Sequence, residues 1–315
     1  MSAGLDAVFE SIGNYVILTN NSFIQAGRSG GYPRPHSKPI YATRGTREGY
    51  NARFVPYFGS SDNLVFVEGK IGVPSAAMVN WDDYYIHSSD DDLDKIDQTQ
   101  LQRNNFIIGA MAFYLAYAEA DEIPVLAAET FAQGGRRLAH DMQKALEILN
   151  ESRNWEDAYI LVEQGIEREK RALDSMRVIA GSDRAANASI DTFIRLIAAK
   201  EMSMRSELKA LETDVDRTNP RAVPQMPASA NKVPANIESS ADYFAKRTRV
   251  RTALHSIMGS EVMNFVDGKR TYHDIYKAVK AESLSAGKFF YGMVTYDDVE
   301  KILDANVKSG ALILK

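Results

Sequence analysis

Apolar side chains recur at the spacing of an amphipathic helix along much of the chain. Near the start, residues 5–16 place five apolar side chains on one helical face, which predicts a first helix within residues 1–26. After residue 122 the same spacing continues with charged residues between the apolar positions. This pattern predicts three long helices, over residues 127–150, 154–180 and 186–213.

Two short apolar runs between these helical patterns look like buried strands. They are FVPYF at 54–58 and SAAMVNW at 75–81. The segment 100–120 is a helix whose apolar positions are so dense that we expect it to pack against a sheet. The fold class expected for residues 1–121 is therefore α/β, a partial sheet with flanking helices.

The rest of the chain reads as helical. Helices as long as those expected after residue 122 are typical of a hairpin or small bundle. A proline-rich stretch then predicts an extended linker. Three helices and a final strand predict a small winged-helix-like domain, whose last helix begins at Thr295 and ends at Gly310. The expected boundaries are 1–121 for the α/β domain, 122–215 for the helical segment, 216–239 for the linker and 240–315 for the last domain.

Composition excludes several classes of site. The chain has 315 residues and no cysteine, so disulfides, thiolate metal ligands and cysteine nucleophiles are ruled out. Its formal net charge of −5 gives no reason to expect a nucleic-acid partner. No apolar run approaches the roughly 18 residues that a membrane span requires, and the first residues show no signal-peptide pattern.

The richest chemistry follows the second expected strand. His87 comes after it, and ligands of open α/β sheets bind beyond the carboxyl ends of strands. Asp90 and Asp91 follow closely, and a carboxylate next to a metal-bound imidazole commonly fixes its orientation. The alternative is that a lone loop histidine and an acidic run are simply solvated.

The order of motifs resembles the C-terminal part of the di-zinc aminopeptidases, a group with bacterial leucyl aminopeptidases and glutamate carboxypeptidase relatives. The motifs are GSSDN from residue 59, GVP from residue 72 and Y-x-HS-x2-D from residue 85, within residues 40–119. The resemblance implies a zinc-peptidase-type sheet, zinc as cofactor, peptide substrates and an exported or periplasmic location. It makes His87 a zinc ligand and places Asp90 and Asp91 behind it. It also implies a substrate pocket lined by Ser61, Asp62, Asn63, Phe66 and Tyr85.

The chain departs from that family before residue 50. A two-zinc site needs about five protein ligands and a glutamate that acts as general base. The first 50 residues contain no His-x-Asp step and no Glu-Glu pair, and their only histidine is His36. The function expected is thus zinc-dependent removal of N-terminal residues from peptides, by a site that this chain leaves incomplete. The alternative is a non-catalytic protein-interaction module, whose exposed apolar surface is covered by self-association or by a missing N-terminal half.

Overall fold

Helices dominate the structure: 66% of the residues are helical and 2% lie in strands. The computed structural model describes residues 3–29, 39–55, 61–80, 83–211 and 226–315. Within these ranges the only sheet has two strands, both from the C-terminal part of the chain. The expected α/β class, with a zinc-peptidase-type sheet over residues 1–121, is therefore wrong.

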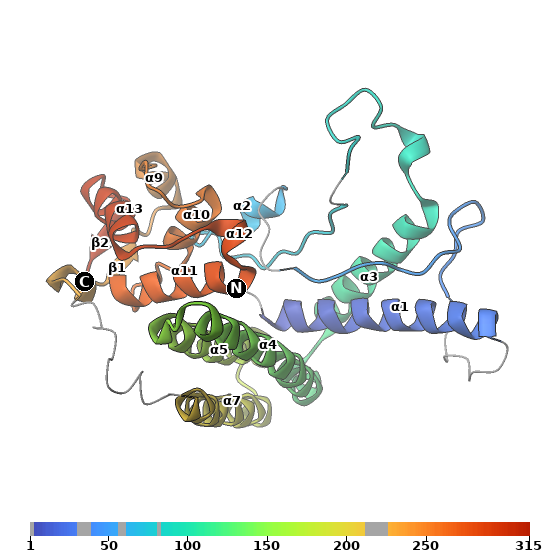
Figure 1. Cartoon of the computed structure of the whole chain (residues 1–315), viewed down its shortest axis with the longest axis horizontal. Helices are drawn as coiled ribbons and strands as arrows, with labels where there is room; N and C mark the ends of the chain where they lie inside the picture. The colour runs from blue at the N-terminus through green and yellow to red at the C-terminus, as the bar shows by residue number, and fades with distance from the viewer. Residues whose placement is uncertain (1–2, 30–38, 56–60, 81–82, 212–225) are drawn as a thin grey trace.

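Three long helices, α4 (Ile123–Ser152), α5 (Trp155–Asp174) and α7 (Arg184–Ala210), form the body of the molecule (Figure 1). The helices predicted over 127–150 and 186–213 are confirmed, whereas the one predicted over 154–180 ends at Asp174 and is followed by a separate short helix. Their buried faces are aliphatic, with Leu138, Ile166 and Ile190 each at most 2% exposed. Burial of such faces, rather than helix propensity alone, is what stabilises helices of this length.

A tight turn connects the short helix α6 (Arg177–Ala180) to α7. Gly181 has a φ of 54°, a backbone conformation that glycine adopts without a steric penalty. The side chain of Asp183 then accepts a hydrogen bond from the backbone N–H of Ala186 at 2.8 Å and caps α7.

An arm, defined as residues 3–119, projects from the body (Figure 1). Its long helix α1 (Ala3–Ser29) begins against the body, and α3 (Gln98–Tyr117) crosses α1 at an angle. The first helix and the helix expected over residues 100–120 are thus both confirmed. The expected sheet behind α3 is not present in the described residues, so one side of α3 faces solvent.

Side chains of α1 and α3 hold the irregular segment 39–50 between them. Asn20 of α1 accepts a hydrogen bond from the backbone N–H of Ile40 at 2.9 Å. Arg103 of α3 is fully buried and donates to the carbonyl oxygens of Ile40 and Glu48, at 3.2 Å and 2.9 Å. These bonds satisfy backbone groups that have no place in a helix or strand.

The two expected strands do not form in the parts of these runs that the structure describes. Of these runs the structure describes residues 54–55 and 75–80, which belong to no strand. Phe54 packs edge-on against Phe9 of α1, with ring centroids 5.4 Å apart, and Met78 packs against the small core between α1 and α3. Residues 75–80 make no backbone–backbone hydrogen bond to any described residue. The runs are apolar enough for a strand but lack a neighbouring strand to pair with.

The C-terminal unit, residues 226–315, has its own apolar core. It holds more elements than the winged-helix-like set of three helices and a strand that the sequence predicts. Residues 226–239, expected to be linker, include a short 3₁₀ helix, with Ala230 buried, and a strand, while residues 216–225 lie outside the described ranges. The strands pair antiparallel, with Pro234 opposite Leu314. The elements are η3 (Ala228–Asn231), β1 (Pro234–Asn236), α9 (Ser240–Lys246), α10 (Ser256–Asn264), α11 (Tyr272–Ala286), α12 (Lys288–Tyr291), α13 (Tyr296–Lys308) and β2 (Leu312–Leu314).

The first of the three helices predicted for this unit is interrupted between α9 and α10. Asn306 of α13 accepts a hydrogen bond from the backbone N–H of Thr248 at 2.9 Å and donates one to its carbonyl oxygen at 3.1 Å. This side chain therefore takes both backbone groups that a continuous helix would use. The capped last helix is confirmed, because Thr295 accepts from the backbone N–H of Asp298 at 3.2 Å.

The C-terminal unit docks on the body through α11, which lies along α5 (Figure 1). Charged side chains surround this contact. Such pairs between partly exposed groups contribute little energy each, but together they fix how the two parts are oriented. The pairs are Lys277–Glu163 at 2.7 Å, Lys280–Asp157 at 2.5 Å and Arg171–Asp267 at 3.3 Å.

Candidate functional site

The loop that carries the expected metal ligand stands clear of the body, at the top of Figure 1. His87 is exposed and has a φ of 62°, a conformation that histidine adopts more often than most other residues. Asp90 and Asp91 are also exposed. Within the described residues neither carboxylate is hydrogen-bonded to the imidazole of His87, so the expected support of a ligand is not seen.

The residues expected to line a substrate pocket fall into two groups that lie apart. One group is at α2 (Asn63–Val67), a short helix beside the C-terminal unit (Figure 1). Tyr85 instead lies in the loop of His87, where the Lys95 ammonium is 4.9 Å from the centre of its ring. The structure therefore does not bring the expected pocket together. The group at α2 consists of Ser61, Asp62, Asn63 and Phe66, and only Asn63 is partly buried.

The described residues do not fit a zinc centre. A catalytic zinc ion is held by at least three protein ligands. Across the described ranges, no three His, Asp or Glu side chains lie close enough together to hold a metal ion. His36 lies outside the described residues.

We expect the purified chain to retain far less than one zinc ion after dialysis against buffer with trace zinc. An exposed single imidazole binds zinc weakly because it supplies one ligand where three are needed. Mass spectrometry of the metal content measures this, and His87→Ala is expected to give the same value. About two zinc ions per chain, lost on His87→Ala, would contradict the structure of this loop.

A cluster of charged side chains, here called the buried charge network, lies inside the body between α1, α4 and α5. Arg137 donates to both carboxylate oxygens of Glu169, from Nε at 2.9 Å and from Nη2 at 2.7 Å. Its Nη1 donates to Glu10 of α1 at 2.5 Å. Arg168 donates to Asp141 at 2.8 Å and to Glu169 at 2.7 Å. Two-pronged pairing of this kind is the strong form of a charge-assisted hydrogen bond.

Two helix glycines make room for the carboxylates of this network. A Cβ atom at Gly134 of α4 would lie 2.7 Å from Oε2 of Glu169, and one at Gly165 of α5 would lie 2.6 Å from Oδ2 of Asp141. Each helix thus has a glycine opposite the acid of the other. The close approach explains why the side chains of Glu169 and Asp141 are only 2% and 1% exposed.

Burial and the two arginines set the pKa values in the network. Burial raises the pKa of Asp6, at the start of α1, to about 6, although the charge of Arg137 opposes the rise. Burial also raises the pKa of Glu10 against the same opposing charge. For Glu169 burial acts in the same direction, but the hydrogen bonds and charges of both arginines outweigh it and lower the pKa.

The sequence analysis missed this network. Charges on a helix are usually taken as its solvated face. The available signal is spacing: Gly134, Arg137 and Asp141 follow one another at three and four residues along α4, and so share one face with the apolar Leu138. Both guanidinium groups are occupied by carboxylates of neighbouring helices, so the network joins helices and does not present a reactive group.

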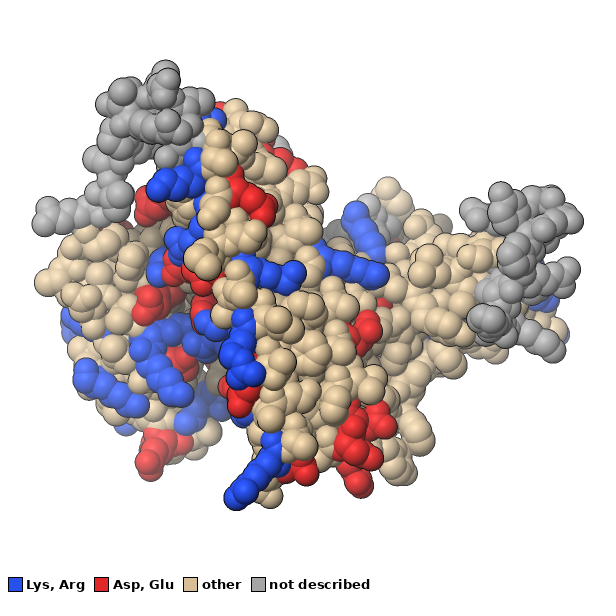
Figure 2. Space-filling view, turned by 90° about the horizontal axis from the view of Figure 1, so that it is seen from below, with Lys and Arg blue, Asp and Glu red and all other residues tan. Residues whose placement is uncertain are grey.

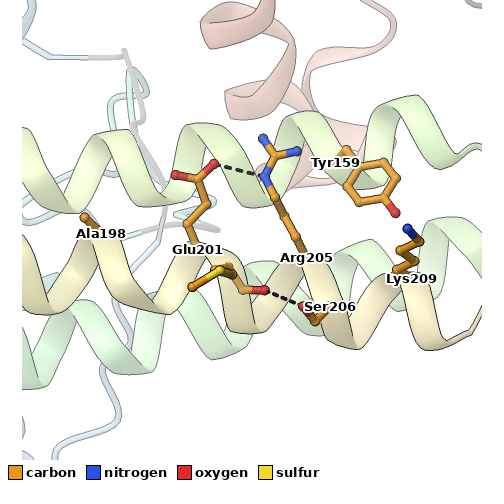
Figure 3. Close-up of a pocket in the computed structure, with 7 residues that line it drawn as sticks. Tyr159, Ala198, Glu201, Arg205, Ser206 and Lys209 are labelled. Carbon is orange, nitrogen blue, oxygen red and sulfur yellow. Dashed lines mark hydrogen bonds and ion pairs between the residues drawn. The ribbon is translucent and has the colours of Figure 1, made fainter.

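A groove of about 450 Å³ runs between α5 and α7 (Figure 3). Arg205 donates to Glu201 at 2.9 Å and to Glu163 at 3.2 Å, so its charge is already paired. The hydroxyl of Ser206 is bonded to the carbonyl oxygen of Met202 at 2.8 Å. The groove therefore offers few uncommitted polar groups. Its lining residues are Tyr159, Ala198, Glu201, Met202, Arg205, Ser206 and Lys209.

The most unusual surface of the molecule is one side of α3, here called the α3 face. Large side chains form its margins, with Leu101 49% and Ile108 45% exposed on one side. Phe113 and Tyr117, whose rings are 4.6 Å apart, are 66% and 72% exposed on the other. An apolar surface this extensive commonly marks an interaction site. The apolar residues of the face are Leu101, Phe106, Ile108, Gly109, Ala112, Phe113, Ala116 and Tyr117, and the exposed polar residues Gln102 and Asn105 lie among them near the start of α3.

Comparison with known proteins gives no relative. No family model, no curated protein and no solved structure matches this chain. In the ranges that the structure describes, every helix is too short or too polar to cross a membrane.

Proposed function

We propose that this chain is a non-catalytic interaction protein, and that its α3 face binds the α3 face of a second copy. The observation that carries the proposal is that α3 from Phe106 onward is apolar on both sides, while the other described residues cover only one of them. A helix that is apolar all round is a buried helix. Within this chain α3 is covered by α1 and the segment 39–50, so the other side requires a cover from elsewhere.

The shape of the face suits a second helix. Its centre consists of the small residues Gly109, Ala112 and Ala116, all exposed, and nothing lies within 4 Å of a Cβ placed at Gly109. Large side chains stand on both sides of this strip. A helix laid along the strip would approach closely, and its own large side chains would meet the margins.

The charge of the face favours a second copy as the partner. The only charged residue among the 20 residues of α3 is Arg103, which is fully buried on the covered side. Two such faces meet without like-charge repulsion and without removing an ion from water. On the side of the molecule shown in Figure 2, acidic and basic side chains gather over the body, and the visible part of the arm carries fewer of them.

The area that a stable dimer buries is larger than α3 alone can supply. A helix of 20 residues is about 30 Å long and about 10 Å wide, a footprint of about 300 Å² per copy. A stable interface buries about 800 Å² per partner. The contact must therefore include neighbouring apolar side chains, and Leu93 and Ile96, 80% and 52% exposed, immediately precede α3.

We expect the wild-type chain to sediment as a dimer at micromolar concentration, with twice the 35.0 kDa mass of one chain. Phe113→Glu places a charge in the contact and is expected to give a monomer with unchanged helix content. Met202→Glu is the matched control, because Met202 is 75% exposed on α7 and lies outside the face. A wild-type chain that stays monomeric at every concentration measured would exclude the proposal. Equal dimer fractions for the two variants would exclude it as well.

A second candidate is the zinc-dependent aminopeptidase implied by the resemblance, completed by polypeptide outside this chain. The observation in its favour is the exposed imidazole of His87, with the exposed carboxylates of Asp90 and Asp91 three and four residues further along the chain. Hydrolysis of leucine p-nitroanilide with added zinc tests this candidate. Activity that His87→Ala abolishes would favour the peptidase, and no activity in either chain agrees with the interaction protein.

A further inference from the structure

A short turn of the arm, residues 66–73, lies against the C-terminal unit and is here called the clasp (Figure 1). Its backbone is closed by its own hydrogen bonds. The N–H of Val73 donates to the carbonyl oxygen of Phe66 at 2.9 Å, and the N–H of Ile71 donates to that of Glu68 at 2.7 Å. The clasp therefore presents three consecutive residues, a glutamate, a glycine and a lysine, to the C-terminal unit in a fixed shape.

The two charged residues of the clasp meet matching groups of the C-terminal unit. The carboxylate of Glu68 is paired at 2.5 Å with the guanidinium group of Arg247, which follows α9. The ammonium of Lys70 donates to the two carbonyl oxygens of segment 237–238, at 2.6 Å and 2.9 Å. This segment follows β1, so its carbonyl oxygens lie beyond the paired residues of the sheet. An acid thus meets a cation, and a cation meets two acceptors.

The middle position of the clasp has room for glycine alone. The backbone N–H of Gly69 donates to Oδ1 of Asn264, at the end of α10, at 2.7 Å. A Cβ at Gly69 would lie 2.7 Å from Cα and 3.0 Å from the carbonyl oxygen of Asn264, and these backbone atoms cannot swing aside. Asn264 donates from Nδ2 to Oε1 of Glu261 at 2.9 Å, which keeps Oδ1 directed at the clasp.

Polar contacts, and not an apolar core, hold the clasp in place. The helix α2 that leads into it has no buried residue, and Val65, Ile71 and Val73 are 62%, 42% and 46% exposed. The ion pair is better covered, with the side chains of Glu68 and Arg247 16% and 22% exposed. A covered pair is screened less by salt than an exposed one. The C-terminal unit therefore recognises the order of an acid, a glycine and a lysine.

We propose that the C-terminal unit carries a recognition site for a peptide turn with the sequence Glu-Gly-Lys, and that the clasp of the same chain occupies this site and keeps it closed. The groups that form the site are Arg247, Asn264 and segment 237–238, all within the C-terminal unit. The partner that fits is a protein segment that presents Glu-Gly-Lys in a tight turn. The site shares no residue with the α3 face and goes beyond the pairing of two copies.

A free peptide reaches the site only after the clasp leaves it. The clasp is part of the same chain, so it competes at a high effective concentration. Gly69→Val removes this competition, because valine cannot lie against the backbone of Asn264. The substitution leaves the apolar core of the C-terminal unit intact, since no residue of the clasp belongs to it. Circular dichroism is expected to show unchanged helix content.

Binding of a fluorescein-labelled peptide of residues 61–73, followed by fluorescence anisotropy, tests the proposal. We expect at least about tenfold tighter binding to the Gly69→Val chain than to the wild type. The same peptide carrying Gly69→Val is expected to bind neither chain. Equal affinity for the two chains, or for the two peptides, would overturn the proposal. An absence of binding to the Gly69→Val chain at about 1 mM peptide would also overturn it.

Charge reversal tests whether Arg247 recognises the acid of the peptide. In the Gly69→Val chain, Arg247→Glu is expected to weaken binding of the natural peptide about tenfold or more, and a peptide carrying Glu68→Arg is expected to restore it. Arg249→Glu is the matched control, because Arg249 is exposed two residues further along and lies outside the site. If both substitutions weaken binding equally, general charge attraction explains it and the recognition site is excluded.

A second variant opens the site if the Gly69→Val chain does not fold. Lys70→Glu places a carboxylate against the two carbonyl oxygens of segment 237–238, which repel it. The natural peptide is expected to bind this chain at least about tenfold more tightly than the wild type. Affinity equal to that of the wild type would contradict the proposal here as well.

Discussion

Arg137→Met is expected to lower the free energy of unfolding by about 3–5 kcal/mol at pH 8, the usual effect of removing one partner from a buried ion pair. The substitution leaves Glu10 and Glu169 facing each other with only Arg168 to balance them. At pH 5 the decrease in the free energy of unfolding is expected to be smaller. Without Arg137 the pKa values of Asp6 and Glu10, already raised by burial, rise further, so these acids take up protons and shed their charge.

Arg136→Met is the matched control for this experiment. Arg136 is the preceding residue of α4 and is exposed, with one hydrogen bond to Gln133 at 3.3 Å. Surface changes of this type alter stability by about 0.5 kcal/mol or less. Urea unfolding followed by circular dichroism at both pH values measures the difference. If the two variants unfold at the same urea concentration, the network does not hold the helices together.

The adjacent glycines of α4 are expected to respond in opposite directions to the same substitution. At Gly135 a Cβ meets nothing within 4 Å, so Gly135→Ala should stabilise the helix by about 0.5–1 kcal/mol through its helix propensity. At Gly134 the new methyl group would lie 2.7 Å from Oε2 and 3.2 Å from Cδ of Glu169. Since two arginines hold that carboxylate, it moves only by weakening their bonds, and a net loss of about 1–3 kcal/mol is expected.

Thermal unfolding of the two alanine variants and the wild type measures the order of their stabilities. The expected order of midpoints is Gly135→Ala, then wild type, then Gly134→Ala. A stabilised Gly134→Ala would show that α4 and α5 are not in the close contact described. A double variant, Gly134→Ala with Glu169→Gln, tests whether the clash with the carboxylate of Glu169 causes the loss of stability. Weaker pairing at residue 169 reduces the penalty of the methyl group.

Local patterns were enough to predict most helices. The spacing of apolar residues in α4, α5 and α7 depends only on one helix and the core beside it. The caps at Asp183 and Thr295 are set by residues three positions away. The interruption after α9 was out of reach, because it depends on Asn306, 58 residues further along the chain.

The expected sheet failed for a related reason. A strand is stable only with a neighbour, and the neighbour is not part of the local pattern. Phe54 has the side chain expected of a strand, but it packs on Phe9 of α1. The argument that placed His87 depended on the carboxyl edge of that sheet, whereas Phe66 was placed by the resemblance alone. The buried charge network was missed because sequence spacing does not tell a solvated charge from one that faces a glycine on the next helix.

A single cysteine on the α3 face tests the central claim most directly, because the natural chain contains no cysteine. Ala112→Cys places a thiol at the centre of the strip of small residues, where the close approach of two copies brings both thiols within disulfide range. Val178→Cys, at a position 89% exposed on α6 of the body, measures random collision. Oxidation at low micromolar concentration is expected to link Ala112→Cys into a dimer and to leave Val178→Cys monomeric. Cross-linking of Ala112→Cys no faster than that of Val178→Cys would contradict pairing through α3.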